Sequence, residues 1–269
     1  MAYGLTKSLD LELGSSQYAR ITDASQTGLQ FTTAMTLEAW VKIESAPSDS
    51  NLSIASKFEN TSSQNQRSYW FRYMDAAGAK TLSLIVSDDG TNAESLSVSQ
   101  TLTVGTWYHV AVTWLGSTST AKFYVDGSQV GTDQTGAVTS LFNNDAPFAV
   151  GVINDDAPSN FFDGLVSLVR AWSVVRTEAE ISANICNVFG TATTNMQGEW
   201  SLNDVYTDAS GNGNTLSAIN VPVFATDVPS TCAVSGPANL KTYNTNEKAN
   251  IKTMNTNPLA NVKTFDTNA

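Results

Sequence analysis

The chain has 269 residues, of which 14% are charged, and its formal net charge is −11 at pH 7. This acidic balance argues against nucleic acid as a partner, because phosphates are bound by basic surfaces. No segment has the roughly 20 consecutive apolar residues that a membrane-spanning helix needs, so we expect no membrane span. The length suits one large β-sandwich with an extension, or two small domains.

The first half of the chain alternates repeatedly between apolar and polar residues, which is the period of a β-strand. Residues 35–43 are the longest such run, with Met35, Leu37 and Ala39 on one face. Connectors rich in Asn, Ser and Gly separate the runs. The strands predicted in this part are residues 9–13, 18–21, 35–43, 52–58, 69–73, 82–86 and 96–102.

Two aromatic-rich strands follow, over residues 106–114 and 121–127. In the first, Trp107 and His109 fall on one face and Tyr108 on the other. The second ends in Asp-Gly, a strong signal for a two-residue hairpin turn. We expect the two strands to pair in antiparallel fashion.

A further strand over residues 161–172 leads to Thr177, a good N-cap that is followed by Glu178 and Glu180. Carboxylates in the first turn favour a helix, so we predict a short helix over residues 177–185. Residues 198–202 give one more strand, and residues 208–214 form a polar loop. Many short strands with one helix predict an all-β antiparallel sandwich, or jelly roll.

Four of these stretches carry a resemblance: Trp-Tyr-His-Val-Ala-Val-Thr, Phe-Tyr-Val-Asp-Gly, the strand containing Val-Arg-Ala-Trp, and Asp-Ala-Ser-Gly-Asn-Gly-Asn. They resemble laminin-G-like, concanavalin A-like lectin/glucanase jelly-roll domains of the broad bacterial and viral type, over about residues 5–225. The resemblance implies a jelly roll that holds glycans on its concave sheet or its end loops. Ser15, Ser16 and Ser167 stand where this family usually has acidic residues, so a family calcium site there lacks its carboxylates.

Two loops are candidates for calcium, which prefers oxygen ligands on flexible loops. In the first, side-chain oxygens alternate at Asp208, Ser210, Asn212 and Asn214. The second contains Asp155 and Asp156, with Asp163 nearby in the sequence. The alternatives are a turn stabilised by its own side chains and a solvated acidic turn, and we favour these. No cofactor is required by the sequence, and calcium is kept as a possible ligand.

Candidate catalytic groups are few. Glycoside hydrolysis needs two carboxylates about 5–10 Å apart, and the Glu-x-Asp-x-x-Glu pattern of hydrolases with this sandwich does not occur. Asp10 and Glu12 alternate on the first strand, where we expect them to face solvent. His109 is the single histidine and lies within an apolar strand, which favours a structural role over that of a base. We therefore expect a protein that is not an enzyme.

Sugar binding in this fold relies on exposed aromatic rings and on amides and carboxylates. The candidates are Trp70 and Tyr73, with Arg72 beside them, on the strand after the long polar loop. The remaining tryptophans are expected in the core: Trp40, Trp107, Trp114, Trp172 and Trp200.

The chain has two cysteines, Cys186 and Cys232. They are either two buried thiols or, as the extracellular type of composition favours, a disulfide that ties the end of the domain to its closing segment.

The C-terminal extension has a sequence pattern of its own. An eleven-residue repeat starts at residues 239, 250 and 261, so we place the jelly-roll domain at residues 1–232 and the extension at 233–269. Repeats of fixed length indicate units that stack on one another, although a disordered linker is the alternative. The tail resembles the C-terminal tails of some surface proteins of phages and uncultured microbes. Its apolar positions, which we expect to mediate self-association, are Leu240, Tyr243, Ile251, Met254, Val262 and Phe265.

These features predict a non-catalytic surface or virion attachment and assembly protein. Its jelly roll would be the recognition surface, and its tail would join copies into a homo-oligomer, filament or particle. The alternative is a carbohydrate-binding lectin module that acts as an adhesin. The first residues lack the features of a signal peptide, so either a leader has been removed or the protein leaves the cell by another route, for instance in a virus particle. Both readings place it outside the cell, on a cell surface or on a virion.

Overall fold

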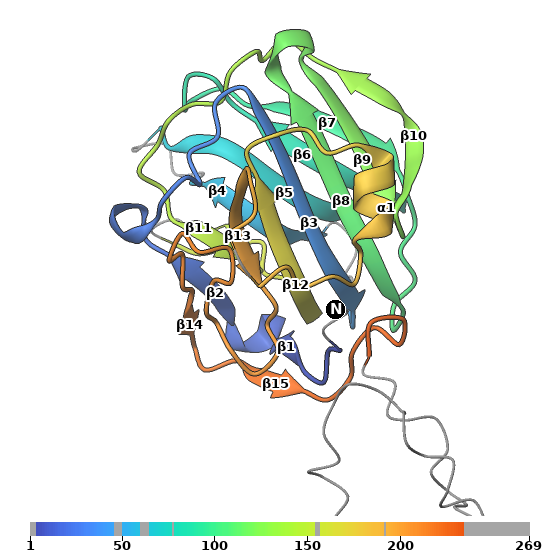
Figure 1. The fold of residues 1–269 in the computed structure, drawn as a ribbon. Coiled ribbons are helices and arrows are strands. Elements are labelled where there is room, and N and C mark those ends of the chain that lie inside the picture. The colour runs from blue at the N-terminus through green and yellow to red at the C-terminus, as the bar shows by residue number, and fades with distance from the viewer. Residues whose placement is uncertain are drawn as a thin grey trace, which may run out of the picture. The chain divides into compact units, whose positions relative to one another are not determined.

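The structure is a computed structural model that describes residues 4–45, 50–59, 65–76, 78–153, 157–190 and 192–233. Within these residues the strands form two sheets of antiparallel pairs, joined to one short α-helix, α1 (Glu178–Ala183) (Figure 1). The predicted all-β antiparallel sandwich is therefore confirmed. The predicted repeats at 239, 250 and 261 lie outside the described residues.

One sheet has eight strands in the described part of the chain, in the order β10–β9–β8–β3–β12–β1–β15, and β13 also pairs with β12. Its strands are β1 (Ser8–Leu11), β3 (Ala34–Ile43), β8 (Trp107–Leu115), β9 (Thr120–Val125), β10 (Ser128–Thr135), β12 (Gly164–Trp172), β13 (Met196–Trp200) and β15 (Val223–Ala225). The predicted aromatic hairpin supplies β8 and β9, where Val112 pairs with Phe123. The α1 helix lies beside this hairpin (Figure 1). Ile181 of the helix packs against Ala111 and Tyr124 on the outer face of the hairpin.

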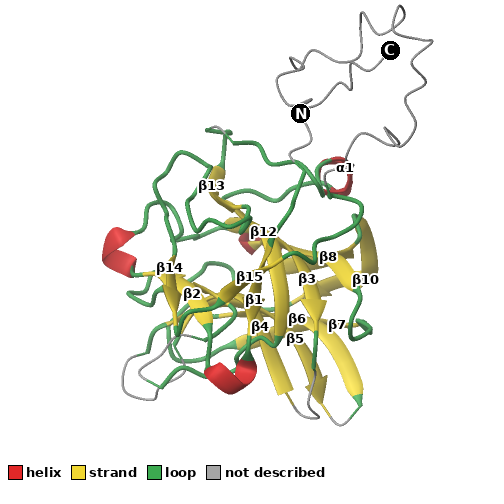
Figure 2. Cartoon of the chain, turned by 90° about the horizontal axis from the view of Figure 1, so that it is seen from below, coloured by secondary structure: helices red, strands yellow, loops and turns green. Residues whose placement is uncertain are grey.

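The other sheet has seven strands among the described residues, in the order β14–β2–β11–β4–β5–β6–β7. Its strands are β2 (Tyr18–Ile21), β4 (Ser50–Phe58), β5 (Arg67–Ala76), β6 (Ala79–Val86), β7 (Glu94–Ser99), β11 (Phe148–Val150) and β14 (Ser217–Ile219). Strands β4 to β7 pair in chain order, so together they form an antiparallel meander. Figure 2 shows that the rest of the described chain is loop and short helical turns.

The core lies between the two inner faces. Leu37 and Val112 from the eight-stranded sheet belong to the same buried cluster as Phe71 and Leu84 from the seven-stranded sheet. Because strand residues alternate between faces, this packing leaves the polar partners of these residues on the outer faces. Each large apolar side chain buried in this way contributes about 1.5–3 kcal/mol to folding.

Two irregularities in the pairing decide which side chains face outward. The register of β4 against β5 shifts between Ser53 and Ala55, and that of β12 against β3 shifts between Ser167 and Arg170. An extra residue in one strand inverts the alternation beyond it. The first shift puts Ser53 and Ser56 on the same outer face, and the second turns Arg170 toward the outer face of the eight-stranded sheet.

Some predicted boundaries are wrong by a few residues. The helix ends at Ala183 rather than 185, because Asn184 is the C-cap and its N–H donates to Ile181 O at 3.1 Å. The start of the helix is as predicted, with Thr177 and Glu180 in a capping box. The first strand ends at Leu11, since Leu13 begins a short 3₁₀ turn. No helix among the described residues is both long and apolar enough to cross a membrane.

Candidate functional site

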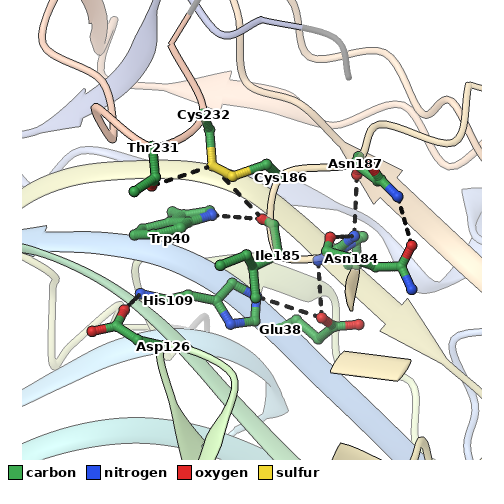
Figure 3. Close-up of a disulfide and its surroundings, with 11 residues drawn as sticks. Glu38, Trp40, His109, Asp126, Asn184, Ile185, Cys186, Asn187, Thr231 and Cys232 are labelled. Carbon is green, nitrogen blue, oxygen red and sulfur yellow. Dashed lines mark hydrogen bonds and ion pairs between the residues drawn. A yellow bond between two sulfur atoms is a disulfide. The ribbon is translucent and has the colours of Figure 1, made fainter. Parts of the chain in front are cut away.

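The outer face of the eight-stranded sheet carries a buried ionic network. Glu38 on β3 accepts hydrogen bonds from Arg170 Nη2 at 2.9 Å and from Trp172 Nε1 at 2.7 Å. His109 Nε2 lies 3.4 Å from Glu38 Oε2 (Figure 3). Glu38, His109 and Arg170 are all buried. Burial alone would raise the pKa of Glu38, but the charge of Arg170 and the contact with His109 outweigh it and lower the pKa to about 2. Glu38 is therefore an ionised carboxylate inside the protein.

His109 belongs to this network rather than to a catalytic triad. Burial lowers the pKa of its imidazole, and its side chain has no exposed surface. A fully buried imidazole cannot reach a substrate in solution. Its structural role agrees with its place in an apolar strand.

The disulfide covers the same region. Cys186 is bonded to Cys232, so the two cysteines are not free thiols (Figure 3). Next to it, Trp40 Nε1 donates to Ile185 O at 2.7 Å, and the backbone N–H of Leu5 donates to Cys232 O at 2.9 Å. The disulfide thus joins the segment after α1 to the segment before residue 234, and both segments lie over the ionic network. These segments cover this part of the outer face.

The sugar-binding prediction on β5 needs a correction. Trp70 is 6% exposed and Tyr73 is 0% exposed, so neither ring is available on the surface. The two residues are three positions apart and therefore point to opposite faces of the strand. Tyr73 belongs to the core and its hydroxyl accepts a hydrogen bond from the Leu102 N–H at 3.2 Å. Trp70 and Arg72 share the outer face.

That outer face carries many hydroxyl groups over β4 to β7, and we call it the serine face. Five of its residues are buried, namely Ser53, Ser56, Trp70, Ser83 and Ile85, and Trp70 and Ile85 pack with Ile153. Its central cross-strand row has Arg72 on β5 paired on one side with Ser53 and on the other with Ser83, which in turn pairs with Ser97. The row on one side has an amide, two hydroxyls and a methionine, and the row on the other has two hydroxyls, a tryptophan and an isoleucine; neither has a carboxylate. The serine face consists of Asn51, Met74, Thr81 and Ser99, then Ser53, Arg72, Ser83 and Ser97, then Ser56, Trp70, Ile85 and Ser95.

Trp70 forms the floor beneath Arg72. The guanidinium carbon of Arg72 lies 4.3 Å from the centre of the indole ring. The ring is fixed by a hydrogen bond from its Nε1 to Ser53 Oγ at 2.9 Å and by contact with Phe58 at 5.7 Å between ring centres. Burial lowers the pKa of Arg72 to about 10, which leaves the side chain charged at neutral pH.

Several polar atoms of the serine face lack a protein partner. Within the described part of the chain, Arg72 Nε, Asn51 Oδ1 and Thr81 Oγ1 are buried without a hydrogen bond. Asn51 and Thr81 both pair with Met74, so the three atoms come from adjacent strands around one point. The face therefore offers donors and acceptors together, which is what a sugar requires.

Of the calcium candidates, the loop of residues 208–214 is a turn that satisfies itself. Asp208 Oδ1 accepts the N–H of Ser210 at 2.8 Å, and Oδ2 accepts the N–H of Asn214 at 2.9 Å. Asn214 Oδ1 accepts the N–H of Thr27 at 2.7 Å, and Asn212 Nδ2 donates to Met196 O at 2.9 Å. This is the geometry of the favoured turn. Asp155 and Asp156 lie outside the described residues.

Asp163, in contrast, lies beside a group of carboxylates. Asp10, Glu12 and Glu44 have side-chain oxygens within 4.8 Å of one another. Burial raises the pKa of Asp10 and of Glu44. The nearby charge of Asp163 raises the pKa of Asp10 further, and the charges of Asp10 and Glu12 raise that of Glu44. Asp163 itself accepts the N–H of Leu13 at 3.0 Å. The sequence places Asp10 and Glu12 on one strand but does not show Glu44 beside them, because Glu44 follows β3 and reaches them only through the pairing of β1 and β3 with β12.

Calcium binding at this acidic cluster was not predicted from the sequence, and it has a simple check. If calcium binds there, a free calcium concentration about ten times the dissociation constant adds about 1.4 kcal/mol to the free energy of unfolding. We expect calcium chloride to raise the melting temperature of the full chain, and Glu44→Gln to remove that rise. Asp133→Asn, which changes an exposed carboxylate on β10, is the control and should keep it. An equal rise in the Glu44→Gln variant would contradict a site at this cluster.

The family comparison agrees with this fold. A family model described as the concanavalin A-like lectin/glucanases superfamily matches residues 13–182. No significant match was found among curated protein sequences.

Solved structures with the same fold come from several sources. A candidate carbohydrate-binding protein of Bacteroides ovatus ATCC 8483 has a TM-score of 0.62 and 22% identity, with 84% of this chain and 63% of that chain covered. The CBM40 module of Ruminococcus gnavus IT-sialidase, bound to α2,6 sialyllactose, has a TM-score of 0.52 and 12% identity, with 67% and 97% covered. The enzymatically active domain of tailspike protein 2 from bacteriophage CBA120 has a TM-score of 0.52 and 14% identity, with 76% and 34% covered. At these identities the similarity establishes the fold alone.

Proposed function

This chain belongs to the concanavalin A-like lectin/glucanase superfamily, and from that premise we propose that it is a non-catalytic glycan-binding protein that attaches to its target through the serine face. Such a role places it outside the cell, on a cell surface or on a particle. The candidate carbohydrate-binding protein of Bacteroides ovatus and the sialyllactose-bound module of Ruminococcus gnavus support carbohydrate as the ligand class.

The observation that carries the proposal is the composition of the serine face. Most outward positions on β4 to β7 carry a hydroxyl or an amide, and the charged residue among them is Arg72. Ser97 and Arg72 are partly exposed, whereas Ser95 and Ser99 are exposed. Hydrogen-bonding groups on a rigid sheet are held in place before a ligand arrives, which reduces the entropy lost on binding.

The same composition supports a binding role over hydrolysis. Glycoside hydrolases use a pair of carboxyl groups that flank the scissile bond. None of the twelve residues of the serine face is an aspartate or a glutamate. A glycan bound there would meet no general acid from the face itself, so we expect it to be released unchanged.

A matched pair of variants tests this location. In Ser97→Trp a large side chain stands on the serine face, whereas in Thr132→Trp it stands at an exposed position of β10 on the other sheet. We expect the full chain to bind glycans on an array, Ser97→Trp to weaken that binding by about tenfold or more, and Thr132→Trp to change it by less than about twofold. Wild-type binding by Ser97→Trp would place the glycan elsewhere.

We further propose that the repeat tail joins copies of the protein or anchors them to a larger structure. The support is the spacing of its apolar residues in three copies of eleven residues. Light scattering on the full chain and on a version ending after Ala233 checks this. An oligomer that becomes a monomer on truncation is the expected result, and a monomer in both cases would contradict it.

A further inference from the structure

We infer that the serine face selects glycans that carry an anionic group, a carboxylate or a sulfate, and that Arg72 is the residue that sets this specificity. The inference rests on the proposed glycan-binding function and adds the chemical class of the ligand. Its basis is the difference between Arg72, which is partly exposed, and the two buried arginines of the described residues, Arg170 and Arg176.

Arginines that enter the interior of this protein are paired. Arg170 Nη2 lies 2.9 Å from Glu38, and its Nη1 donates to the carbonyl of Asn184 at 2.8 Å. Arg176 Nη2 donates to the carbonyl of Glu180 at 3.1 Å. The Nε atoms of Arg72, Arg170 and Arg176 all lack a hydrogen bond, but Arg170 and Arg176 lie beside the carboxylate of Glu38. Within the described residues, Arg72 makes no salt bridge. A partly buried charge without a counter-charge is unfavourable for folding. The position of Arg72 therefore favours a role in binding over a role in stability.

Arg72 is also held in a fixed geometry. Its guanidinium lies against Trp70, and the indole is anchored by Ser53. A planar guanidinium held on an aromatic ring presents its remaining N–H groups as a fork, which matches the oxygens of a carboxylate or a sulfate. Because the fork is already oriented, little side-chain entropy is lost when an anion binds.

The surroundings fit the uncharged remainder of a sugar. Asn51 and Thr81 supply unpaired oxygens on one side of the row, and Ser97 supplies a partly exposed hydroxyl along it. Ser83 is buried, and its Oγ lies 3.1 Å from Ser95 Oγ. Partly buried Met74 lies between Asn51 and Thr81 and offers an apolar contact for a pyranose ring. A ligand with one negative charge and several hydroxyls would therefore satisfy the groups that the protein leaves unpaired.

Glycans in matched neutral and anionic forms test the inference. The array carries lactose, 3′-sialyllactose and 3′-sulfolactose, together with other neutral glycans and their sialylated, uronate and sulfated forms. We expect the anionic forms to bind about tenfold or more tightly than their neutral counterparts. Comparison of the sialylated and uronate forms with the sulfated forms identifies which anion is preferred.

Two variants separate charge from geometry. Arg72→Gln should remove the preference for anionic glycans, so that the neutral and anionic forms of one glycan bind with equal affinity. Arg72→Lys keeps the positive charge but not the planar guanidinium, and it should retain part of the preference. The melting temperature should fall less in Arg72→Gln than in Arg170→Gln, because Arg72→Gln removes the contact with Trp70 but no ion pair. Arg170→Gln is the matched control and should lower the melting temperature.

The outcomes distinguish this inference from the proposed function. Equal binding of neutral and anionic glycans, or an unchanged preference in Arg72→Gln, would overturn the role of Arg72 and leave glycan binding intact. A protein that binds no glycan on the array would contradict both.

Discussion

Replacing Glu38 with alanine is expected to lower the free energy of unfolding by about 3–5 kcal/mol. The carboxylate of Glu38 accepts hydrogen bonds from both Arg170 and Trp172. Arg176 Nη1 lies 3.9 Å from Glu38 Oε1. Removal of the carboxylate leaves a fully buried arginine without its counter-charge, and the cost of that desolvated charge is the main part of the effect. Urea unfolding of the wild type and the variant measures it.

A surface ion pair is the control for this experiment. Asp133 pairs with Lys122 at 3.1 Å, and both side chains are well exposed. Asp133→Ala should change the free energy of unfolding by less than about 1 kcal/mol. If Glu38→Ala lost no more than this control, the buried network would not be the stabilising element that we describe.

The same network gives a pH dependence with a definite sign. The pKa of Glu38 is lowered from 4.5 to about 2 in the folded protein, so the unfolded chain binds more protons in that range. The ionised carboxylate of Glu38 therefore makes its whole contribution to the free energy of unfolding above about pH 4.5, and this contribution is lost as the pH falls toward 2. Burial also lowers the pKa of His109 from 6.5, so a further loss begins as the pH falls below that value. Glu38→Gln should reduce the acid loss, and an unchanged pH profile would contradict this assignment.

Loss of the disulfide should have the second large effect on stability. Cys186 and Cys232 are 46 positions apart in the sequence, and closing a loop of that length stabilises the folded state by about 4 kcal/mol in the chain-entropy model. We expect Cys186→Ser with Cys232→Ser to lower the free energy of unfolding by about this amount. The bond also holds the segment that covers Trp40 and Leu168, so the loss includes packing there.

Denaturation with and without dithiothreitol checks this result. The reductant should destabilise the wild type to the level of the double serine variant and leave that variant unchanged. If the double variant unfolded at the same urea concentration as the wild type, the covering segment would be held by its other contacts alone.

The sequence was sufficient to predict the central strands and insufficient for the peripheral ones. Strands β3 and β8 are long and have clear alternation, so their type and approximate ends follow from the pattern. Strand β10 is polar along most of its length and β11 has three residues, so neither has a recognisable period. Their pairing depends on partners that are distant in the chain.

The positions of the ionic network and of the serine face depend on how neighbouring strands are aligned, and the sequence does not show this alignment. The pair of Glu38 and Arg170 requires both the alignment of β3 with β12 and the shift after Ser167. Similarly, Ser53 and Ser56 reach one face only because β4 has an irregularity between Ser53 and Ala55. The misplacement of Tyr73 had a simpler cause, since strict alternation already puts it opposite to Arg72. The pairing of Cys186 with Cys232 needed no register, because the chain has no third cysteine.

The most direct test of the central claim is a map of amide chemical shifts on the full chain. The glycan that binds most tightly on the array is titrated into the labelled protein, and the shifted amides are located in the fold. Glycan binding at the serine face predicts that the largest shifts lie on β4 to β7, around Arg72 and Ser83. Shifts that gather instead near Asp10 and Glu44, or on the eight-stranded sheet, would contradict the account and move the recognition site to that surface.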